Sequence, residues 1–133
     1  MIMKQVYICS PYRGDIERNT KLARKAGRFA AMSGKVPLIP HLVFPQFLDD
    51  SEPEERALGI TLAVEMLMAC DELWLIGDTI SKGMRHELGI AKKFEIPVRC
   101  YDVNLHHIDP DTIDVDDRVD DVFRAELHGA HLL

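Results

Sequence analysis

The sequence predicts an α/β fold, with a single domain built as a three-layer, doubly wound parallel sheet. Two observations predict it. Apolar runs of strand length alternate with segments of helical periodicity, in the order strand, helix, strand, helix, strand, helix, strand. The clearest unit is at residues 73–91, where an apolar strand passes through Gly77 and Asp78 into a helix. A length of 133 residues, 47% of them hydrophobic, fits one domain with its own core.

The first strand and helix are expected within residues 4–34. Residues 4–9 are β-rich, and the strand stops before Pro11, because proline cannot donate a hydrogen bond to a sheet. Asp15 can cap the helix that follows, and apolar residues recur at helical spacing until Gly34 ends it. This pair of elements opens the first crossover of the sheet.

A short second strand and a covering segment are expected next. Residues 36–39 are apolar, and Pro37 indicates that this strand lies at the edge of the sheet. Residues 41–50 read as an apolar loop or broken helix, of the kind that covers a site. Ser51 and Glu54 form a capping-box pattern, which predicts that the next helix starts there.

The helix expected from Ser51 to about Cys70 is strongly apolar. Between residues 57 and 70 its only charged residue is Glu65. A helix that is apolar nearly all round must be buried on more than one side. The sequence therefore predicts that a second subunit covers this helix, in a homo-oligomer that is most simply a dimer.

The last strand is expected at residues 96–101, and it completes a Rossmann- or flavodoxin-like order of elements. The core of the single domain is therefore expected at residues 4–101. Residues 102–133 form an acidic C-terminal tail, with one short helix expected near residues 119–127.

Composition argues against several partners. A formal net charge of -6 disfavours a nucleic-acid polymer or an anionic membrane as the main partner. The sequence shows neither a charged-then-apolar leader nor an apolar span of about 18 residues, so a cytoplasmic protein is expected. Cys9, Cys70 and Cys100 are widely spaced beside apolar runs, so reduced and buried thiols are expected.

The turn after the first strand can bind an anion. Residues 10–15 join a strand to a helix N-terminus, where backbone N–H groups, the helix dipole and the Arg13 guanidinium favour a phosphate. The turn has neither the GxGxxG pattern nor a Walker lysine, so a dinucleotide or NTPase site is not supported. An ordinary structural turn is the alternative.

The helix after the central strand carries a second candidate site. Gly83 and Glu87 are four residues apart and therefore lie on one helix face. The missing side chain at Gly83 leaves room for a ligand beside the Glu87 carboxylate, at the carboxyl end of the sheet. Such a placement suits a nucleophilic glutamate.

Together these segments resemble the nucleoside 2-deoxyribosyltransferase-like superfamily, which includes nucleoside deoxyribosyltransferases and deoxynucleoside monophosphate N-glycosidases. The resemblance covers residues 4–101 and rests on Tyr7 and the turn after it, on His41, and on residues 81–89, Ser-Lys-Gly-Met-Arg-His-Glu-Leu-Gly. Its strongest part is the G-[MVL]-x-x-E-[LI]-G signature at 83–89.

The resemblance implies cleavage or transfer of the N-glycosidic bond of a (deoxy)nucleoside or nucleotide through a glutamyl ester, without a metal or an organic cofactor. Glu87 matches the family's nucleophile, and Tyr7 resembles the tyrosine that helps to position it. Ser10, Arg13 and Ser81 fall where members that cleave monophosphates hold phosphate. The full set of expected substrate-binding residues is Ser10, Arg13, Gly14, His41, Asp78, Ser81, Gly83 and Met84.

One position departs from the family pattern. The second carboxylate, which protonates the departing base, comes about eight residues before the Asp71 position, where this sequence has Ala63. Glu65 is the expected substitute, because burial in an apolar helix would raise its pKa and keep it protonated. The alternative is that Glu65 pairs with an arginine at a subunit contact.

A non-catalytic nucleotide-binding or sensing protein with the same fold and pocket is the alternative function, because the absent acid permits it. Two other patterns are weaker. Asp78 is similar to the phosphoacceptor of receiver-type folds, but Ser10 and Pro11 stand where an acidic pair should be. The histidines and aspartates of the tail have irregular spacing, which favours a solvated terminus over a metal site.

Overall fold

A four-stranded parallel sheet in the order β2-β1-β3-β5 is at the centre of the computed structural model, which describes residues 2–77, 79–109 and 114–115. Its strands are β1 (Gln5–Cys9), β2 (Val36–Leu38), β3 (Glu72–Ile76) and β5 (Val98–Tyr101). Each lies within two residues of its predicted bounds. The predicted single-domain, doubly wound α/β fold is therefore confirmed.

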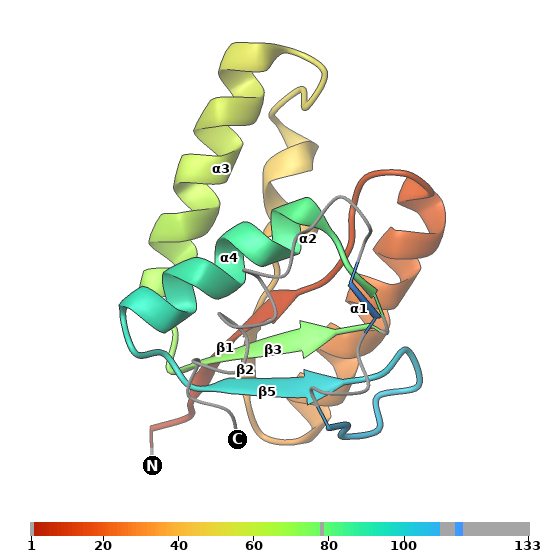
Figure 1. Ribbon diagram of the computed structural model, residues 1–133, viewed down its shortest axis with the longest axis vertical. Coiled ribbons are helices and arrows are strands. Elements are labelled where there is room, and N and C mark those ends of the chain that lie inside the picture. The colour runs from red at the N-terminus through yellow and green to blue at the C-terminus, as the bar shows by residue number, and fades with distance from the viewer. Residues whose placement is uncertain (1, 78, 110–113, 116–133) are drawn as a thin grey trace.

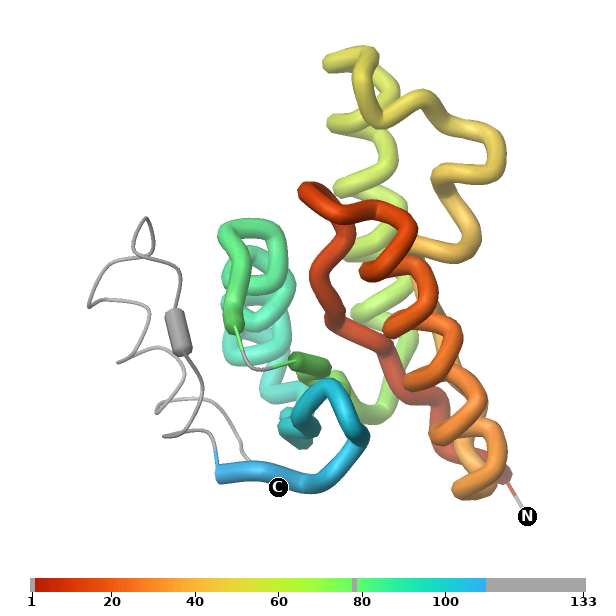
Figure 2. The backbone as a smooth tube through the Cα atoms, turned by 90° about the vertical axis from the view of Figure 1, so that its right-hand side faces the viewer, coloured from red at the N-terminus to blue at the C-terminus, as the bar shows by residue number. Residues whose placement is uncertain are grey.

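Helices cover both faces of this sheet, as the three-layer prediction requires. The long helices are α1 (Ile16–Met32), α3 (Pro53–Met68) and α4 (Lys82–Lys93), and Figure 2 shows α1 and α4 on opposite sides of the strands. The core is divided accordingly, because successive side chains of a strand point to opposite faces. On β1, Val6 and Ile8 pack with α1, whereas Tyr7 and Cys9 pack with α4.

The first half of the chain folds as its local signals predict. Asp15 caps α1, since its side chain accepts a hydrogen bond of 3.1 Å from the backbone N–H of Arg18. Gly34 ends this region with a φ of +80°, a left-handed conformation that glycine adopts without a steric cost. β2 pairs only with β1 among the described strands, so the edge position predicted from Pro37 is confirmed.

The segment between β2 and α3 is a broken helix. It consists of α2 (Pro40–Val43) followed by one turn of 3-10 helix, η1 (Phe44–Gln46). The capping box predicted from Ser51 and Glu54 is wrong. α3 begins at Pro53 after Glu52, without a side-chain cap, because the Ser51 hydroxyl instead donates to Asp49 Oδ1 at 2.6 Å. The Ser51 hydroxyl therefore belongs to a local Asx-type turn and does not cap the helix.

Much of the apolar surface of α3 is uncovered in the single chain. Leu67 is the helix residue that is fully buried, whereas Leu58, Ile60 and Met68 are 47%, 46% and 45% exposed. Figure 1 shows the Pro53 end of α3 extending beyond the sheet. The sheet of one chain therefore covers only part of the helix.

Two features of the second half were not predicted. Between β3 and α4 lies a short strand, β4 (Thr79–Ile80), which pairs in parallel with β6 (Asp114–Val115). Residues 102–108 fold back along β5 through a bridge between Tyr101 and His107. The helix predicted at 119–127 lies outside the described residues. Among the helices that are described, none is long and apolar enough to cross a membrane.

Candidate active site

Glu87 is held at the border between core and surface by the amphipathic face of α4. The Ser81 hydroxyl caps this helix by accepting a hydrogen bond of 3.3 Å from the N–H of Met84. Met84 and Leu88 are 2% and 1% exposed and fix one helix face in the core. Glu87 lies next to that face, so its side chain is half-buried and its Oε2 atom is fully buried.

Tyr7 and Cys9 lie opposite Glu87 on β1. They are two residues apart, so they share the strand face that points toward α4, and both are 0% exposed. The Cys9 thiol lies 3.9 Å from the carbonyl oxygen of Met84, which joins the strand to the first turn of the helix. The structure therefore brings together the two residues, Tyr7 and Glu87, that the sequence placed in one site.

These three side chains act on one another electrostatically. Burial raises the pKa of Glu87 from 4.5 to about 7, against smaller lowering effects of the Cys9 thiol and the Tyr7 hydroxyl. Burial, and next to it the Glu87 charge, raises the pKa of Tyr7 and that of Cys9 well above their ordinary values. At neutral pH Tyr7 and Cys9 are therefore protonated donors, and Glu87 is partly ionised.

Three buried polar atoms lack a hydrogen-bond partner within the described part of the chain: Tyr7 Oη, Glu87 Oε2 and Ser10 Oγ. Tyr7 and Glu87 are close enough to change each other's pKa, yet neither of these oxygens completes a hydrogen bond of good geometry. Buried polar groups are normally paired. These atoms therefore have free capacity for a polar ligand or a water molecule.

His41 supports the turn after β1. Its Nε2 lies 2.9 Å from the carbonyl oxygen of Ser10, which can only accept, so the ring nitrogen donates. The imidazole also stacks on Tyr12, with ring centroids 4.8 Å apart. Burial lowers the pKa of His41, so the ring is neutral near pH 7. His41, an expected substrate-binding residue, therefore already donates one ring N–H to the backbone of Ser10.

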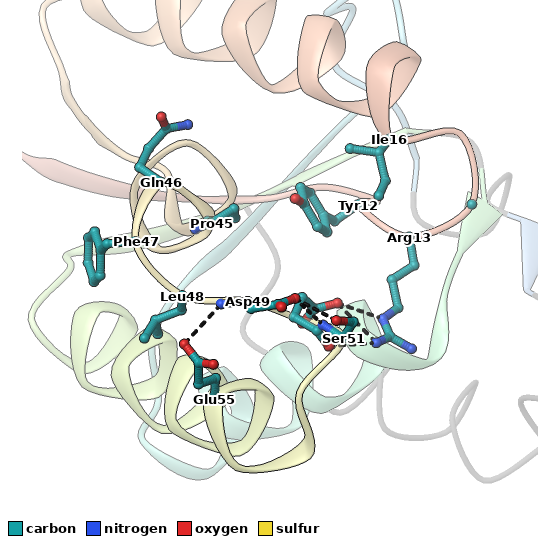
Figure 3. Close-up of a pocket in the computed structure, with 12 residues that line it drawn as sticks. Tyr12, Arg13, Ile16, Pro45, Gln46, Phe47, Leu48, Asp49, Ser51 and Glu55 are labelled. Atoms are coloured by element: carbon teal, nitrogen blue, oxygen red, sulfur yellow. Dashed lines mark hydrogen bonds and ion pairs between the residues drawn. The ribbon is translucent and has the colours of Figure 1, made fainter.

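Arg13 lies across an open groove between this turn and the segment before α3 (Figure 3). Its Nε and Nη2 atoms each lie 3.0 Å from Oδ2 of Asp50, so the guanidinium expected to bind phosphate is engaged in an ion pair. Gly14 supplies the turn with a φ of +96°. The groove has a volume of about 860 Å³, and Glu87 is not among its lining residues. It is therefore a separate feature from the cluster of Tyr7, Cys9 and Glu87.

Gly83 lies beside open space, whereas Met84, another residue expected to contact the ligand, is buried. A Cβ atom added at Gly83 would have nothing within 4 Å, so the space beside the helix N-terminus is open, as the sequence predicts. The Met84 side chain belongs to the core and is 2% exposed, so its expected contact with a substrate stays a prediction. Asp78 lies outside the described residues.

Glu65 does not have the environment that was expected for a general acid. It is exposed on α3, whereas Ala63 two residues earlier is half-buried. The burial expected for Glu65 is therefore wrong for the single chain. The sequence pattern was misleading because α3 is only partly covered by its own sheet.

Cys9 is the site residue that sequence reasoning missed. The sequence predicts a reduced and buried thiol at this position, and Cys9 is indeed a free, buried thiol, as are Cys70 and Cys100. The available signal was its spacing of two from Tyr7 on a strand, which places both side chains on one face. Among the residues that the structure describes, no group of three or more His, Cys, Asp and Glu residues is arranged to hold a metal ion.

Comparison with solved structures defines the class of fold, which is that of the 2-deoxyribosyltransferases. A 2-deoxyribosyltransferase from Bacillus psychrosaccharolyticus aligns with a TM-score of 0.64 and 18% identity, over 92% of this chain and 90% of that chain. A 2-desoxiribosyltransferase from Leishmania mexicana gives a TM-score of 0.52 and 18% identity, over 94% and 95%. A conserved protein from Enterococcus faecalis V583 gives 0.58 and 18%, over 98% and 90%.

The family follows from the sequence itself. Residues 4–101 match the family described as Domain of unknown function (DUF7768), and the chain belongs to that family. These bounds coincide with the core expected from the order of strands and helices. No curated protein matches the sequence.

Proposed function

We propose that this protein cleaves or transfers the N-glycosidic bond of a (deoxy)nucleoside or nucleotide through a glutamyl ester on Glu87. The observation that supports it best is that Tyr7 of β1 and Glu87 of α4 lie close enough to change each other's pKa, while Tyr7 Oη and Glu87 Oε2 are buried without a hydrogen-bond partner in the described structure. The fold shared with two proteins named as 2-deoxyribosyltransferases agrees with this proposal.

The proposed reaction has two steps. An ionised oxygen of Glu87 attacks the anomeric carbon of the sugar while the bond to the base nitrogen breaks, and the base leaves with the electron pair and takes up a proton. Water, or the nitrogen of a second base, then attacks the same carbon and releases the carboxylate. Both steps pass through an oxocarbenium-like transition state, which a carboxylate against the ring stabilises.

Tyr7 and Gly83 have distinct parts in this proposal. The Tyr7 hydroxyl stays protonated, so it supports the ionised form of Glu87 as a donor and does not compete with it as an anion. The open space beside Gly83 admits the sugar, or its phosphate, next to the helix that carries the carboxylate. Ser10 and Ser81, at the ends of β1 and β4, would contact a phosphate together with Arg13, once Arg13 is released from Asp50.

Protonation of the departing base is the weak step of this mechanism. Ala63 has no proton to give, and Glu65 is exposed in the single chain. A general acid contributes roughly 10² to 10⁴ in rate, so without one we expect slow turnover. A second subunit on α3 would bury Glu65, either as the acid or as the partner of an arginine across the contact.

The missing general acid, together with the unpartnered buried oxygens, favours a second candidate. This is a nucleotide-binding or sensing protein that keeps the pocket but does not catalyse the reaction. A protein without a general acid, but with free buried polar atoms, can bind a nucleotide without cleaving it. In this reading Glu87 hydrogen-bonds the sugar hydroxyls. The two candidates share the ligand class and differ in whether a covalent bond forms at Glu87.

One experiment separates them. The protein is incubated with a panel of deoxynucleosides and their monophosphates, and free base is measured by chromatography beside Glu87→Gln as the control. Base release that the control lacks, with a covalent adduct on the Glu87 peptide from a 2'-fluoro substrate, supports the enzyme. Thermal stabilisation by a nucleotide without base or adduct supports the binder. Neither effect with any ligand contradicts both.

We also propose that the protein acts on this small molecule as a cytoplasmic homodimer that is assembled through α3. The exposed Leu58, Ile60 and Met68 support the assembly, since one chain leaves them uncovered. The net charge of -6 supports a small ligand held by local groups over a nucleic-acid polymer.

A further inference from the structure

Cys9 lies in the proposed site, and the mechanism above gives it no part. We propose that Cys9 is a positioning residue, whose S–H group points at the carboxylate of Glu87 and holds it toward β1 in its ionised form. The inference deepens the proposed function and rests on it, because an ionised and oriented Glu87 is what a nucleophile requires.

The position of Cys9 places its sulfur beside the part of α4 that carries Glu87. Cys9 and Tyr7 are neighbours on one face of β1, and both are fully buried against α4. The thiol lies 3.9 Å from the carbonyl oxygen of Met84, and Glu87 follows Met84 by three residues, almost one helical turn. The sulfur is therefore fixed beside the segment of α4 from which the carboxylate projects.

Two acceptors compete for the single hydrogen of the Cys9 thiol. A thiol has a single proton to donate. Here the neutral carbonyl oxygen of Met84 lies 3.9 Å from the sulfur, and, beside burial, the Glu87 carboxylate is close enough to raise the pKa of the thiol. A hydrogen bond to a charged acceptor is the stronger of the two. Burial raises the pKa of Glu87, and the thiol opposes that rise, which is the effect of a donor on an acid.

The protonation state of the Cys9 thiol excludes a role as a nucleophile. Burial raises the pKa of Cys9 well above its ordinary value, and the Glu87 charge raises it further. The sulfur therefore remains an S–H group near neutral pH and is not a thiolate nucleophile. Cys9 acts on the substrate only through Glu87.

The titratable groups around Glu87 provide a control variant for measuring the effect of Cys9 on its pKa. Tyr7 and Cys9 of β1 act directly on Glu87. Cys70, after α3, acts on Tyr7, and Cys100 of β5 acts on Cys9. Cys100 is 2% exposed in the same core cluster, so Cys100→Ala removes the same atoms from the same core without removing the donor to Glu87.

The test follows the titration of Glu87 by ¹³C NMR of the full chain labelled at the glutamate carboxyl carbons. The Glu87 signal is identified by its loss in Glu87→Gln. We expect Cys9→Ala to move the midpoint upward by several tenths of a pH unit. Cys9→Ser keeps a donor, so its midpoint should lie close to that of the wild type. Cys100→Ala should leave the midpoint unchanged. An unchanged midpoint in Cys9→Ala, or an equal shift in Cys100→Ala, overturns the proposal.

A measurement on the wild-type chain covers the case in which Cys9→Ala does not fold. The S–H stretching band of Cys9, identified by its loss in Cys9→Ser, should shift as pH passes through the Glu87 midpoint, and a constant band overturns the proposal. Both readouts are independent of turnover. A moved midpoint without release of base contradicts the proposed reaction alone, and an unmoved midpoint with release of base contradicts the role of Cys9 alone.

Discussion

The Tyr7 hydroxyl and the Glu87 carboxylate act on each other across the contact between β1 and α4. Burial raises the pKa of both groups; beside that effect, the hydroxyl lowers the pKa of Glu87 and the carboxylate raises the pKa of Tyr7. The effects have opposite signs because each group favours the form of the other that completes a donor–acceptor pair.

Tyr7→Phe should shift the pH dependence of turnover while leaving the fold intact. The ring stays buried, and the hydroxyl that is lost has no hydrogen bond of good geometry within the described residues. Loss of the donor raises the pKa of Glu87, so less of it is ionised at pH 7. The acid limb of kcat/KM should move to higher pH, with activity largely regained above it. A uniform loss at every pH would contradict this role.

Glu87→Gln should stabilise the protein at alkaline pH. The pKa of Glu87 in the folded protein is about 7, above its ordinary 4.5. The free energy of unfolding of the wild type therefore falls as the pH rises from about 4.5 to about 7, and it is constant with respect to this group at higher pH. The shift corresponds to up to about 3 kcal/mol. Urea unfolding should therefore show the variant to be more stable at about pH 8, with the difference vanishing below about pH 4. A difference that is independent of pH would mean that Glu87 is solvated.

Gly83→Ala should separate folding from ligand binding. The new methyl group meets nothing within 4 Å, and alanine is the better helix former, so the fold should gain roughly 0.5–1 kcal/mol. The same methyl group fills the space proposed for the sugar, so turnover or nucleotide affinity should fall. Gly89→Ala is the matched control, because it lies on the same helix and is equally open. Equal effects of both variants on the ligand would remove Gly83 from the site.

Arg13→Ala should weaken binding of a nucleotide more than binding of its parent nucleoside. A phosphate has to displace Asp50, whose Oδ2 lies 3.0 Å from Arg13 Nη2. Asp50→Asn should therefore tighten nucleotide binding, because it leaves the guanidinium without a competing charge. Fold stability should change by no more than about 1 kcal/mol in either variant, as for an exposed ion pair. Calorimetric titration with both ligands measures this, and equal losses for nucleotide and nucleoside would make Arg13 structural.

Leu58→Glu should dissociate the proposed dimer. Leu58 is 47% exposed on α3, so a charge there costs the single chain little but would be buried in an interface. Phe47→Glu is the control, since Phe47 is exposed but lies beside the groove, outside α3. Light scattering at micromolar concentration should show a wild-type dimer, a Leu58→Glu monomer and a Phe47→Glu dimer. A monomeric wild type would contradict the assembly.

The order of elements was predictable because its signals are local. Pro11 ends the first strand, Asp15 caps the first helix, and the apolar run before Gly77 marks the central strand. The spacing of Gly83 and Glu87 likewise placed an open position and a carboxylate on one face of a helix. Such patterns depend on neighbours a few residues away, which a sequence displays directly.

The tertiary structure decided what depends on distant neighbours. Glu65 is exposed on α3 because one chain does not cover that helix. The sequence determined that Tyr7 and Cys9 share a strand face, but only the packing of α4 on β1 brought Glu87 to them. The physical reason is that a carboxyl group obtains its pKa from burial and from the donors around it, and both come from contacts between segments far apart in the chain.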